Sequence, residues 1–281
     1  MQTVTTIKSL RKILKPLKQQ GKTIGFVPTM GALHEGHLSL MRKARRECDI
    51  VVVSIFINPK QFGPNEDFTR YPRQKKKDEL LTKKEKIDIM WHPSEEEMYP
   101  DGYLTYVETV KLGNILCGEF RPGHFKGVTT VVAKLLNCVT PDNLYLGQKD
   151  GQQAMILTKM VEDLDYDVKV KICPTLREKD GLALSSRNVF LTESQRREAP
   201  ILYKALQTAK KAIKAGERDA QTIVQSIRSL ITKESSGKID YISCVDRRTL
   251  SSLQFIQGSV MIALAVRFGA VRLIDNIVVQ A

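Results

Sequence analysis

Residues 28–37 read Pro28-Thr29-Met30-Gly31-Ala32-Leu33-His34-Glu35-Gly36-His37, and they stand between an apolar run and a helical pattern. The preceding run, Thr23–Val27, has the character of a short buried strand, and apolar residues recur at helical spacing from Leu38 onward. Strand, glycine-containing loop and helix in this order are typical of a phosphate site. Glycine lets backbone come close to a ligand, and a helix start offers N–H groups and a positive dipole end. The stretch therefore predicts a nucleotide site.

Two histidines of this loop, His34 and His37, are three residues apart and would lie on one face of a helix. They could contact phosphate or bind zinc, or one could cap the helix while the other faces solvent. An H-x-G-H match alone does not separate the phosphate reading from the structural one. Zinc is the least favoured reading, because the sequence has neither the spacing of metalloprotease histidines nor a paired C-x-x-C.

The charge balance of the 281-residue chain is strongly basic, with a formal net charge of +13. Such a field attracts polyanions. The lysines cluster at Lys75–Lys77, Lys83–Lys84 and Lys210–Lys211, where acidic residues interrupt them and no aromatic residues are interleaved to stack on bases. This pattern favours solvated helix faces over a nucleic-acid site, and the positive field also suits nucleoside triphosphates and small carboxylates.

The sequence carries no sign of a membrane or secretory protein. No apolar run approaches the length of a membrane span, and the basic N-terminal segment lacks the apolar core of a signal peptide. The five cysteines are dispersed and mostly have apolar neighbours, which is typical of buried, reduced thiols. We therefore expect a cytoplasmic protein that has no membrane or nucleic-acid partner.

Apolar strands alternate with helical patterns through about residue 175, which predicts a mostly parallel α/β sheet. The run 50–57 is β-branched throughout and should be a central strand, and it stops at Asn58-Pro59. Ligands of open α/β sheets gather at such carboxyl ends, although Asn58-Pro59 could also be a simple turn. Further elements are expected as a helix at 5–20, a helix at 128–139, and strands at 143–146 and 168–172.

The pattern changes beyond residue 176, where two amphipathic helices are followed by strands that are not separated by helices. The helices are expected at 193–214 and 219–234, and the strands at 239–245, 260–266 and 274–279. Helices and strands that are segregated in this way predict a smaller α+β domain. The chain should therefore have two domains, 1–175 and 176–281.

Two more polar loops follow strands of the first domain. In the loop 147–153, Lys149 could neutralise phosphate, and Asp150 could accept from a ribose hydroxyl or hold a magnesium-bound water. In the loop 180–188, Ser185, Ser186 and Arg187 carry the hydroxyls and guanidinium that suit phosphate. Each loop alone could equally be an exposed charge pair or a helix cap, but three such loops after strands of one sheet favour a shared ligand site.

Six segments of the chain are similar to motifs of the pantoate–β-alanine ligase family, and they follow one another in the family's order over nearly the whole chain. They are 28–37, 56–62, 71–73, 121–132, 147–153 and 179–188. The resemblance implies a Rossmann-like parallel sheet domain at 1–175 and a C-terminal α+β lid domain at 176–281. It also implies that ATP activates (R)-pantoate as pantoyl adenylate, which β-alanine converts to pantothenate with release of AMP.

The resemblance also assigns roles to residues of this sequence. The catalytic residues would be His34, His37, Lys149 and Arg187, with His37 as the proton donor. Gln61 and Gln153 would bind pantoate, with Gln61 also near β-alanine, and Asn58 would lie with them in the substrate site. ATP would be contacted by Met30, Gly31, Ala32, Leu33, His34, Glu35, Gly36, His37, Gly147, Gln148, Lys149, Asp150, Leu176, Leu184, Ser185, Ser186 and Arg187.

The chain departs from the family at Gln74–Lys77, where relatives often carry acidic residues that help to bind magnesium. Metal ligation from this helix is therefore not expected, with Asp78 the only acidic residue at a comparable place. The metal ligands stay unassigned, and Mg²⁺ is expected to be held mainly through ATP phosphates. The resemblance further implies a homodimer formed through the first domain. Rival readings are another nucleotidyltransferase of the same superfamily, which would not need Gln61 and Gln153, and a basic nucleic-acid-binding module.

Overall fold

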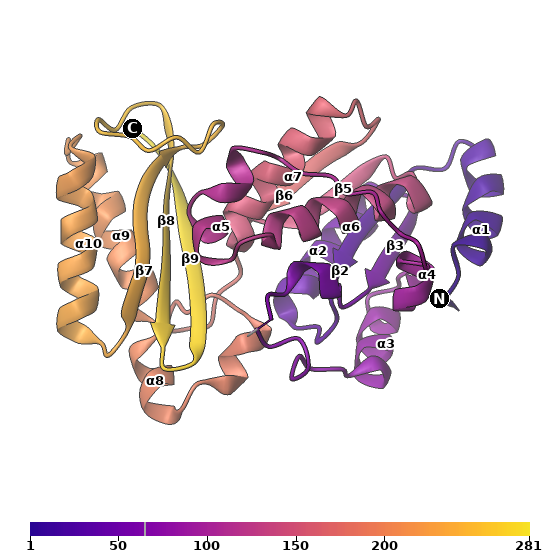
Figure 1. Ribbon diagram of the computed structural model, residues 1–281, viewed down its shortest axis with the longest axis horizontal. Helices are drawn as coiled ribbons and strands as arrows, with labels where there is room; N and C mark the ends of the chain where they lie inside the picture. The colour runs from indigo at the N-terminus through magenta and orange to yellow at the C-terminus, as the bar shows by residue number, and fades with distance from the viewer. Residues whose placement is uncertain (65) are drawn as a thin grey trace. The chain divides into compact units, whose positions relative to one another are not determined.

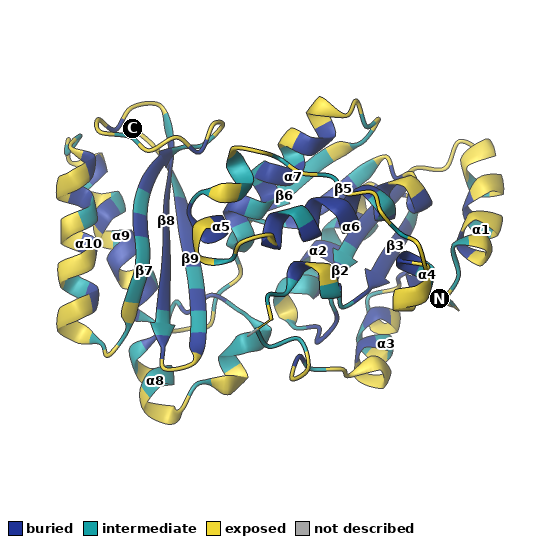
Figure 2. Cartoon of the chain, viewed as in Figure 1, coloured by how far each residue is buried: buried dark blue, intermediate teal, exposed yellow. Residues whose placement is uncertain are grey.

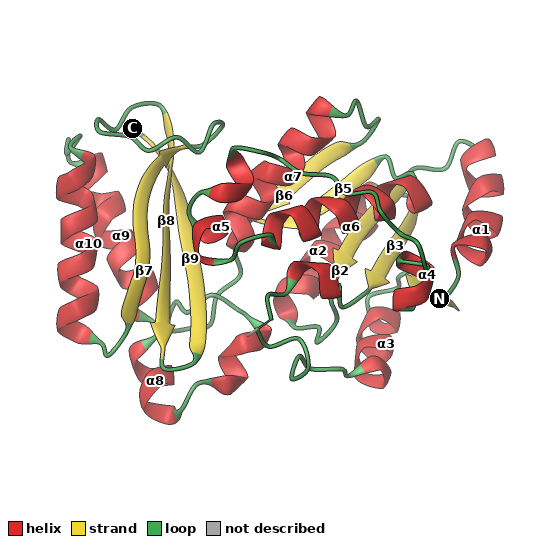
Figure 3. Ribbon diagram, in the orientation of Figure 1, coloured by secondary structure: helices red, strands yellow, loops and turns green. Residues whose placement is uncertain are grey.

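The computed structural model describes residues 1–64 and 66–281, and the chain divides into two compact units. The first unit contains residues 1–147 and 156–173, and the second contains 148–155 and 174–281. Each unit is built around its own sheet (Figures 1 and 3).

The first unit has a six-stranded parallel sheet in the order β1-β4-β3-β2-β5-β6. Its strands are β1 (Gln2–Val4), β2 (Ile24–Thr29), β3 (Ile50–Ile55), β4 (Ile89–Trp91), β5 (Asn143–Gly147) and β6 (Lys169–Cys173). Its helices are α1 (Ile7–Gln19), α2 (Glu35–Glu47), α3 (Lys75–Lys84), α4 (Glu95–Met98), α5 (Cys117–Phe120) and α6 (His124–Val139), with short 3₁₀ turns η1 (Pro59–Gln61) and η2 (Leu112–Asn114). Chain order reverses between β2 and β5, and ligands of such sheets bind at the carboxyl ends beside this switch point.

The core of this unit follows from the apolar strands that the sequence shows. β3 is buried over nearly all of its length, and α2 packs its apolar face, including Met41 and Ala44, against β2 and β3. Burial on both faces explains why β3 carries an uninterrupted β-branched run. α6 is the most buried helix of the unit and packs against β2, α1 and η1.

Several boundaries differ from those predicted from the sequence. β2 continues through Pro28 and Thr29, which pair with Ser54 and Ile55, so the loop begins at Met30. Proline is tolerated there because it removes a donor only near the strand end. α6 begins at His124 rather than at 128, and β3 ends at Ile55 rather than at 57. β1 and β4 were not predicted, because three residues are too few to show a periodic pattern.

The second unit has a three-stranded antiparallel sheet in the order β7-β8-β9, with strands β7 (Lys238–Asp246), β8 (Ser259–Phe268) and β9 (Val271–Gln280). The helices α9 (Ile201–Lys214) and α10 (Ala220–Glu234) share one apolar core with this sheet. Figure 2 shows β8 buried along almost its whole length and the outer face of α10 exposed. The expected parallel α/β sheet and smaller α+β region are thus confirmed.

One predicted helix of this unit is wrong in detail. The segment 193–214 is two helices, α8 (Glu193–Glu198) and α9, because Pro200 has no N–H to continue the helical hydrogen bonds. The remaining elements are η3 (Gln148–Asp150), η4 (Ser186–Phe190) and α7 (Gly151–Asp163), whose first turn belongs to the second unit and whose remainder belongs to the first.

All five cysteines are free and buried, as the sequence predicted. None of the helices in the part of the chain that the structure describes is long and apolar enough to cross a membrane.

Candidate active site

The loop after β2 is held in a conformation that its sequence dictates. Gly31 has a φ of +81°, and a Cβ at this position would lie 2.9 Å from Oδ2 of Asp78, so the residue must be glycine. Ala32 follows at a φ of +50°, which is uncommon for a residue with a side chain. The Oγ1 of Thr29 donates to the carbonyl of Ser54 at 2.8 Å and accepts from the N–H of Gly31 at 3.2 Å. The loop is therefore tied to the end of the sheet.

Asp78 of α3 is the second anchor of this loop. Its carboxylate accepts from the N–H of Ala32 at 3.0 Å and from the N–H of Leu33 at 2.8 Å, and the residue is only 1% exposed. Burial raises the pKa of Asp78, although both N–H bonds act in the opposite direction. No role in the loop was predicted for this residue from the sequence.

His34 and His37 hydrogen-bond at the start of α2 in a reciprocal capping arrangement. The Nδ1 of His34 accepts from the N–H of Gly36 at 3.1 Å, and the Nδ1 of His37 accepts from the N–H of His34 at 3.3 Å. A neutral imidazole whose Nδ1 accepts carries its proton on Nε2. Both rings are thus set to donate through Nε2–H, so capping the helix and contacting a phosphate are compatible roles.

Backbone N–H groups of this loop are already used within the protein. Those of Gly31, Ala32, Leu33, His34 and Gly36 all donate to side chains of the same unit. The sequence pattern predicted that such groups would be offered to phosphate, and the structure corrects this for these five.

Gln61 belongs to the same cluster, because its Nε2 lies 3.1 Å from the Sδ of Met30 in the loop. Its Oε1 accepts from the Nδ2 of Asn58 at 3.1 Å, which turns the amide so that the nitrogen faces Met30. Asn58 is 1% exposed, and its Oδ1 accepts from the hydroxyl of Tyr99 at 2.7 Å. The carbonyl of Gly127 and the N–H of Lys60 fix the orientation of the Asn58 amide, so its nitrogen faces Gln61 and Gln61 presents a donor. Tyr99 was not found from the sequence.

The backbone at Gln61 is fixed by α6. A Cβ on Gly127 would lie 2.1 Å from the carbonyl oxygen of Lys60, so the helix can pack against η1 only with glycine there. The Nδ1 of His124 lies 2.8 Å from the carbonyl oxygen of Gln61, and Arg121 donates to the same oxygen at 3.3 Å. Gly127 and His124 of the segment 121–132 therefore help to hold the backbone at Gln61 in place.

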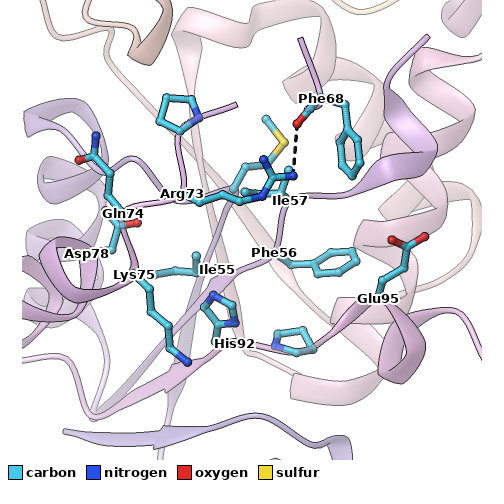
Figure 4. Close-up of a pocket in the computed structure, with 13 residues that line it drawn as sticks. Ile55, Phe56, Ile57, Phe68, Arg73, Gln74, Lys75, Asp78, His92 and Glu95 are labelled. Atoms are coloured by element: carbon cyan, nitrogen blue, oxygen red, sulfur yellow. Dashed lines mark hydrogen bonds between the residues drawn. The ribbon is translucent and has the colours of Figure 1, made fainter. Parts of the chain in front are cut away.

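A pocket of about 370 Å³ opens at the carboxyl ends of β2, β3 and β4 (Figure 4). Its lining consists of Met30, Ile55, Phe56, Ile57, Phe68, Pro72, Arg73, Gln74, Lys75, Asp78, His92, Pro93 and Glu95. The walls are largely apolar, as expected of a small-molecule site, and Arg73 and Lys75 add positive charge. Burial lowers the pKa of His92, so its ring is neutral at neutral pH. Of the predicted site residues, only Met30 lines this pocket.

Arg73 is itself held by the segment that forms the pocket wall. Its guanidinium donates to the carbonyls of Phe68, Thr69 and Tyr71, each at 3.2 Å, and the bond to Phe68 is drawn in Figure 4. These contacts fix the direction in which the arginine enters the lining. The Tyr71-Pro72-Arg73 motif thus belongs to a folded segment that forms part of the pocket wall.

Gly147 ends β5 in the first unit, and the predicted nucleotide contacts from Gln148 onward belong to the second unit. The Nζ of Lys149 lies 3.2 Å from Oδ1 of Asp150 in η3. The Oγ of Ser185 caps η4 by accepting from the N–H of Arg187 at 3.2 Å, and the N–H of Leu184 donates to the carbonyl of Leu176 at 3.0 Å. The unit therefore brings Leu176 and Leu184–Arg187 onto one segment, while Gln153 is half-buried in the first turn of α7.

A parallel sheet whose strand β2 leads through a glycine-containing loop into a helix, with His34 and His37 at the helix start, is the architecture of nucleotide-binding α/β proteins. The chain matches the family model described as pantoate-beta-alanine ligase over residues 2–278, and it belongs to that family. It is 52% identical to a pantothenate synthetase from Caldicellulosiruptor bescii over the full length of both chains. It is 51% identical to one from Thermotoga neapolitana, with 98% of this chain and 99% of that protein covered.

Solved structures of this family share the fold. A pantothenate synthetase from Thermus thermophilus matches with a TM-score of 0.95 at 42% identity, and all of both chains is covered. A pantoate-beta-alanine ligase from Francisella tularensis, complexed with beta-gamma ATP and β-alanine, matches with a TM-score of 0.81 at 40% identity. That match covers 99% of this chain and 97% of the other.

Proposed function

We propose that this chain ligates (R)-pantoate and β-alanine to pantothenate, with ATP converted to AMP and pyrophosphate. Membership of the pantoate–β-alanine ligase family supports the reaction. The structural observations that support the assignment are the Nδ1 contacts that hold His34 and His37 at the start of α2 and the contact of the Gln61 amide with Met30 of the same loop.

The first step is the activation of pantoate. A carboxylate oxygen of pantoate attacks the α-phosphorus of ATP, a new P–O bond forms, and the bond from the α-phosphorus to pyrophosphate breaks. The Nε2–H groups of His34 and His37 donate to the phosphate oxygens as charge develops, with His37 as the proton donor. Preorganised donors of this kind each contribute about 10²–10³ in rate.

The second step consumes the adenylate. The amine of β-alanine attacks the acyl carbon of pantoyl adenylate, an amide bond forms, AMP leaves with the oxygen that bridged the two groups, and the nitrogen loses a proton. Adenylation comes first because a free carboxylate is a poor acyl donor. The mixed anhydride must also be kept from water until the amine arrives.

In this proposal, neutral amide side chains bind pantoate, and cationic and hydroxyl side chains bind the phosphates of ATP. Gln61 holds pantoate through its Nε2, and Gln153 is the second pantoate amide. Neutral amides bind hydroxyl and carboxylate groups without a full ion pair that would lower the nucleophilicity of the carboxylate. ATP as a whole contacts Met30–His37, Gly147–Asp150, Leu176 and Leu184–Arg187. Among these residues, Lys149, Ser185, Ser186 and Arg187 hold the leaving pyrophosphate.

Asn58 acts on the substrate through Gln61 in this proposal. Its Nδ2 donates to Gln61 and to the carbonyl of Gly127, and its Oδ1 accepts from Tyr99 and from the N–H of Lys60. A buried amide with these four partners is suited to positioning the glutamine. Tyr99→Phe should accordingly raise KM for pantoate while KM for ATP stays the same.

Magnesium is proposed to enter on the phosphates of ATP. Within residues 1–64 and 66–281, no group of three or more His, Cys, Asp or Glu side chains could hold a metal ion. Asp78, the acidic residue next to the lysine run, binds the Ala32 and Leu33 N–H groups instead. These observations support magnesium that is carried by the nucleotide rather than by a cluster of protein carboxylates. The ion keeps several waters and needs few protein ligands when it is bound to a nucleotide.

A homodimer and a cytoplasmic location are also proposed, on the resemblance to the family and on the sequence pattern respectively. Light scattering coupled to gel filtration tests the first, because a monomeric mass at micromolar concentration would contradict it.

The experiment that tests the proposed function is pyrophosphate release from ATP and magnesium with pantoate, in the presence and absence of β-alanine. Release that requires pantoate, with pantothenate found by mass spectrometry only after β-alanine is added, is the expected result. Absence of pantoate-dependent release would overturn the substrate assignment. Salt-sensitive oligonucleotide binding without ATP turnover would favour the nucleic-acid alternative.

A further inference from the structure

Asn276 of β9 holds the backbone of η3, the turn that carries Lys149. Its Nδ2 donates to the carbonyls of Gln148 and Lys149, both at 2.9 Å, and its Oδ1 accepts from the Nε2 of Gln148 at 2.7 Å. The side chain is 5% exposed. Because carbonyl oxygens only accept, the amide nitrogen must face η3, and the orientation of this asparagine is fixed.

Gly151, the residue that follows η3, packs closely against Asn276 and thereby supports this contact. A Cβ on Gly151 would lie 2.9 Å from Oδ1 of Asn276 and 2.9 Å from Sδ of Met261. The junction of η3 and α7 therefore approaches the sheet more closely than any residue with a side chain would allow.

Asp275, the preceding residue of β9, holds a second segment. Its carboxylate forms a two-point ion pair with the guanidinium of Arg177, with distances of 2.6 and 2.9 Å. Arg177 also donates to the carbonyl of Gly181 at 3.1 Å and stacks 3.8 Å from the ring centre of Tyr203. Asp275 is 3% exposed. The ion pair thus fixes the turn between Leu176 and Leu184, whose backbones are hydrogen-bonded to each other.

Adjacent residues of a strand point to opposite faces of the sheet. One dipeptide can therefore reach two different segments, η3 through Asn276 and the 177–181 turn through Asp275. Under the proposed function, η3 carries residues assigned to ATP, and the 177–181 turn lies between Leu176 and Leu184, which are also assigned to ATP. Two successive residues of one strand thus link the two segments.

We propose that Asp275 and Asn276 are positioning residues for ATP, through which the C-terminal sheet sets the nucleotide-contacting segments in register. The inference rests on the proposed function for the ATP roles of Lys149, Leu176 and Leu184. Asn276 acts through the backbone of Lys149 and does not touch the reacting atoms.

Asn276→Asp tests the inference, because aspartate has nearly the same size but brings an oxygen against the carbonyls of Gln148 and Lys149. The dissociation constant of a non-hydrolysable ATP analogue, measured by calorimetry, should rise about tenfold, a change of about 1.4 kcal/mol. KM for pantoate should stay within about twofold. Gln280→Ala, at the exposed end of the same strand, is the matched control and should bind the analogue normally. Asn276→Ser introduces no charge, and it carries the test if the aspartate variant shows no melting transition.

A double-mutant cycle with Lys149→Ala separates positioning from a general loss of structure. If Asn276 acts through Lys149, the double variant should bind the analogue no more weakly than Lys149→Ala alone, within about twofold. Fully additive losses, or normal binding by folded Asn276 variants, would overturn the inference. A wild-type protein that binds the analogue but lacks pantoate-dependent pyrophosphate release would instead overturn the proposed function and leave this binding test valid.

Discussion

The two histidines of the first loop combine a structural and a chemical role in different atoms. The Nδ1 of each ring accepts a hydrogen bond from a backbone N–H. In the neutral ring the proton is then on Nε2, which can donate to phosphate in the proposed reaction. A substitution that keeps the first role and removes the second should separate them.

His37→Asn is that substitution, because the amide oxygen of asparagine can accept from the N–H of His34 as Nδ1 does. The rate of pantoate-dependent pyrophosphate release should fall about 10²–10³-fold. The free energy of unfolding in urea should change by less than about 1 kcal/mol, whereas His37→Ala should lose both rate and helix cap. Wild-type rates in a folded His37→Asn protein would exclude the proton-donor role.

Asp78→Asn should weaken the loop, because asparagine has one acceptor oxygen for the two N–H groups of Ala32 and Leu33. A loss of about 1–3 kcal/mol in the free energy of unfolding is expected at pH 7. Thr82→Ser, one turn further along α3, is a milder control in the same buried surroundings.

The same pair of proteins gives a pH test with a definite sign. Burial raises the pKa of Asp78 in the folded state, so folded protein binds a proton over a range where the unfolded chain does not. The cost of burying the charge is present above the folded pKa and disappears as pH falls toward the ordinary aspartate value. The stability gap between wild type and Asp78→Asn should therefore widen on acidification, and a gap that narrows in urea titrations would contradict this.

At the contact between α6 and η1, helix propensity and packing make opposite demands on residue 127. Gly127→Ala should favour the helix by about 1 kcal/mol from propensity alone. The added Cβ would meet the Lys60 carbonyl, so we expect the protein to lose stability instead and KM for pantoate to rise as Gln61 is displaced. Gly63→Ala, where a Cβ would have its nearest neighbour at 3.7 Å, should be tolerated. A stabilised Gly127→Ala protein with unchanged KM would refute the packing argument.

The elements that have a clear local sequence pattern could be predicted from the sequence. The strand, loop and helix around His34 and the β-branched strand β3 are of this kind, since periodicity and glycine placement act over a few residues. The strands β1 and β4 were too short for that signal, and Pro200 divides a helix whose apolar spacing reads as continuous. The order of strand, loop and helix was thus predictable, while several boundaries were not.

Residues that support the site could not be predicted, because their partners are distant in the sequence. Asp78 binds a loop 46 residues away, Tyr99 reaches Asn58 across 41 residues, and Asn276 reaches Gln148 across 128. A single buried polar residue has no periodic signature. The family resemblance named the groups expected to touch substrates, and the structure adds those that hold the contacting groups in place.

In the whole molecule, each unit has its own core, and the reactivity of the buried cysteine thiols can be used to test the burial of both cores. Burial raises the pKa of the Cys138 and Cys173 thiols in the first unit and raises that of Cys244 in the second to about 12. We expect a thiol-specific reagent at pH 8 to label none of the five cysteines rapidly in the native protein and all of them in urea. Peptide mapping by mass spectrometry would show whether Cys244 and Cys138 are exposed together. Rapid native labelling of Cys244 would contradict the buried core of the second unit.

The reaction as a whole has one isotopic signature, because the oxygen that bridges pantoate and phosphate must leave with AMP. The most direct measurement uses pantoate labelled with ¹⁸O in both carboxylate oxygens, together with ATP, magnesium and β-alanine, and determines the masses of the products. The proposed adenylate predicts that one ¹⁸O appears in AMP and one remains in the amide carbonyl of pantothenate. Pantothenate formed with unlabelled AMP would contradict activation of pantoate at the α-phosphorus of ATP.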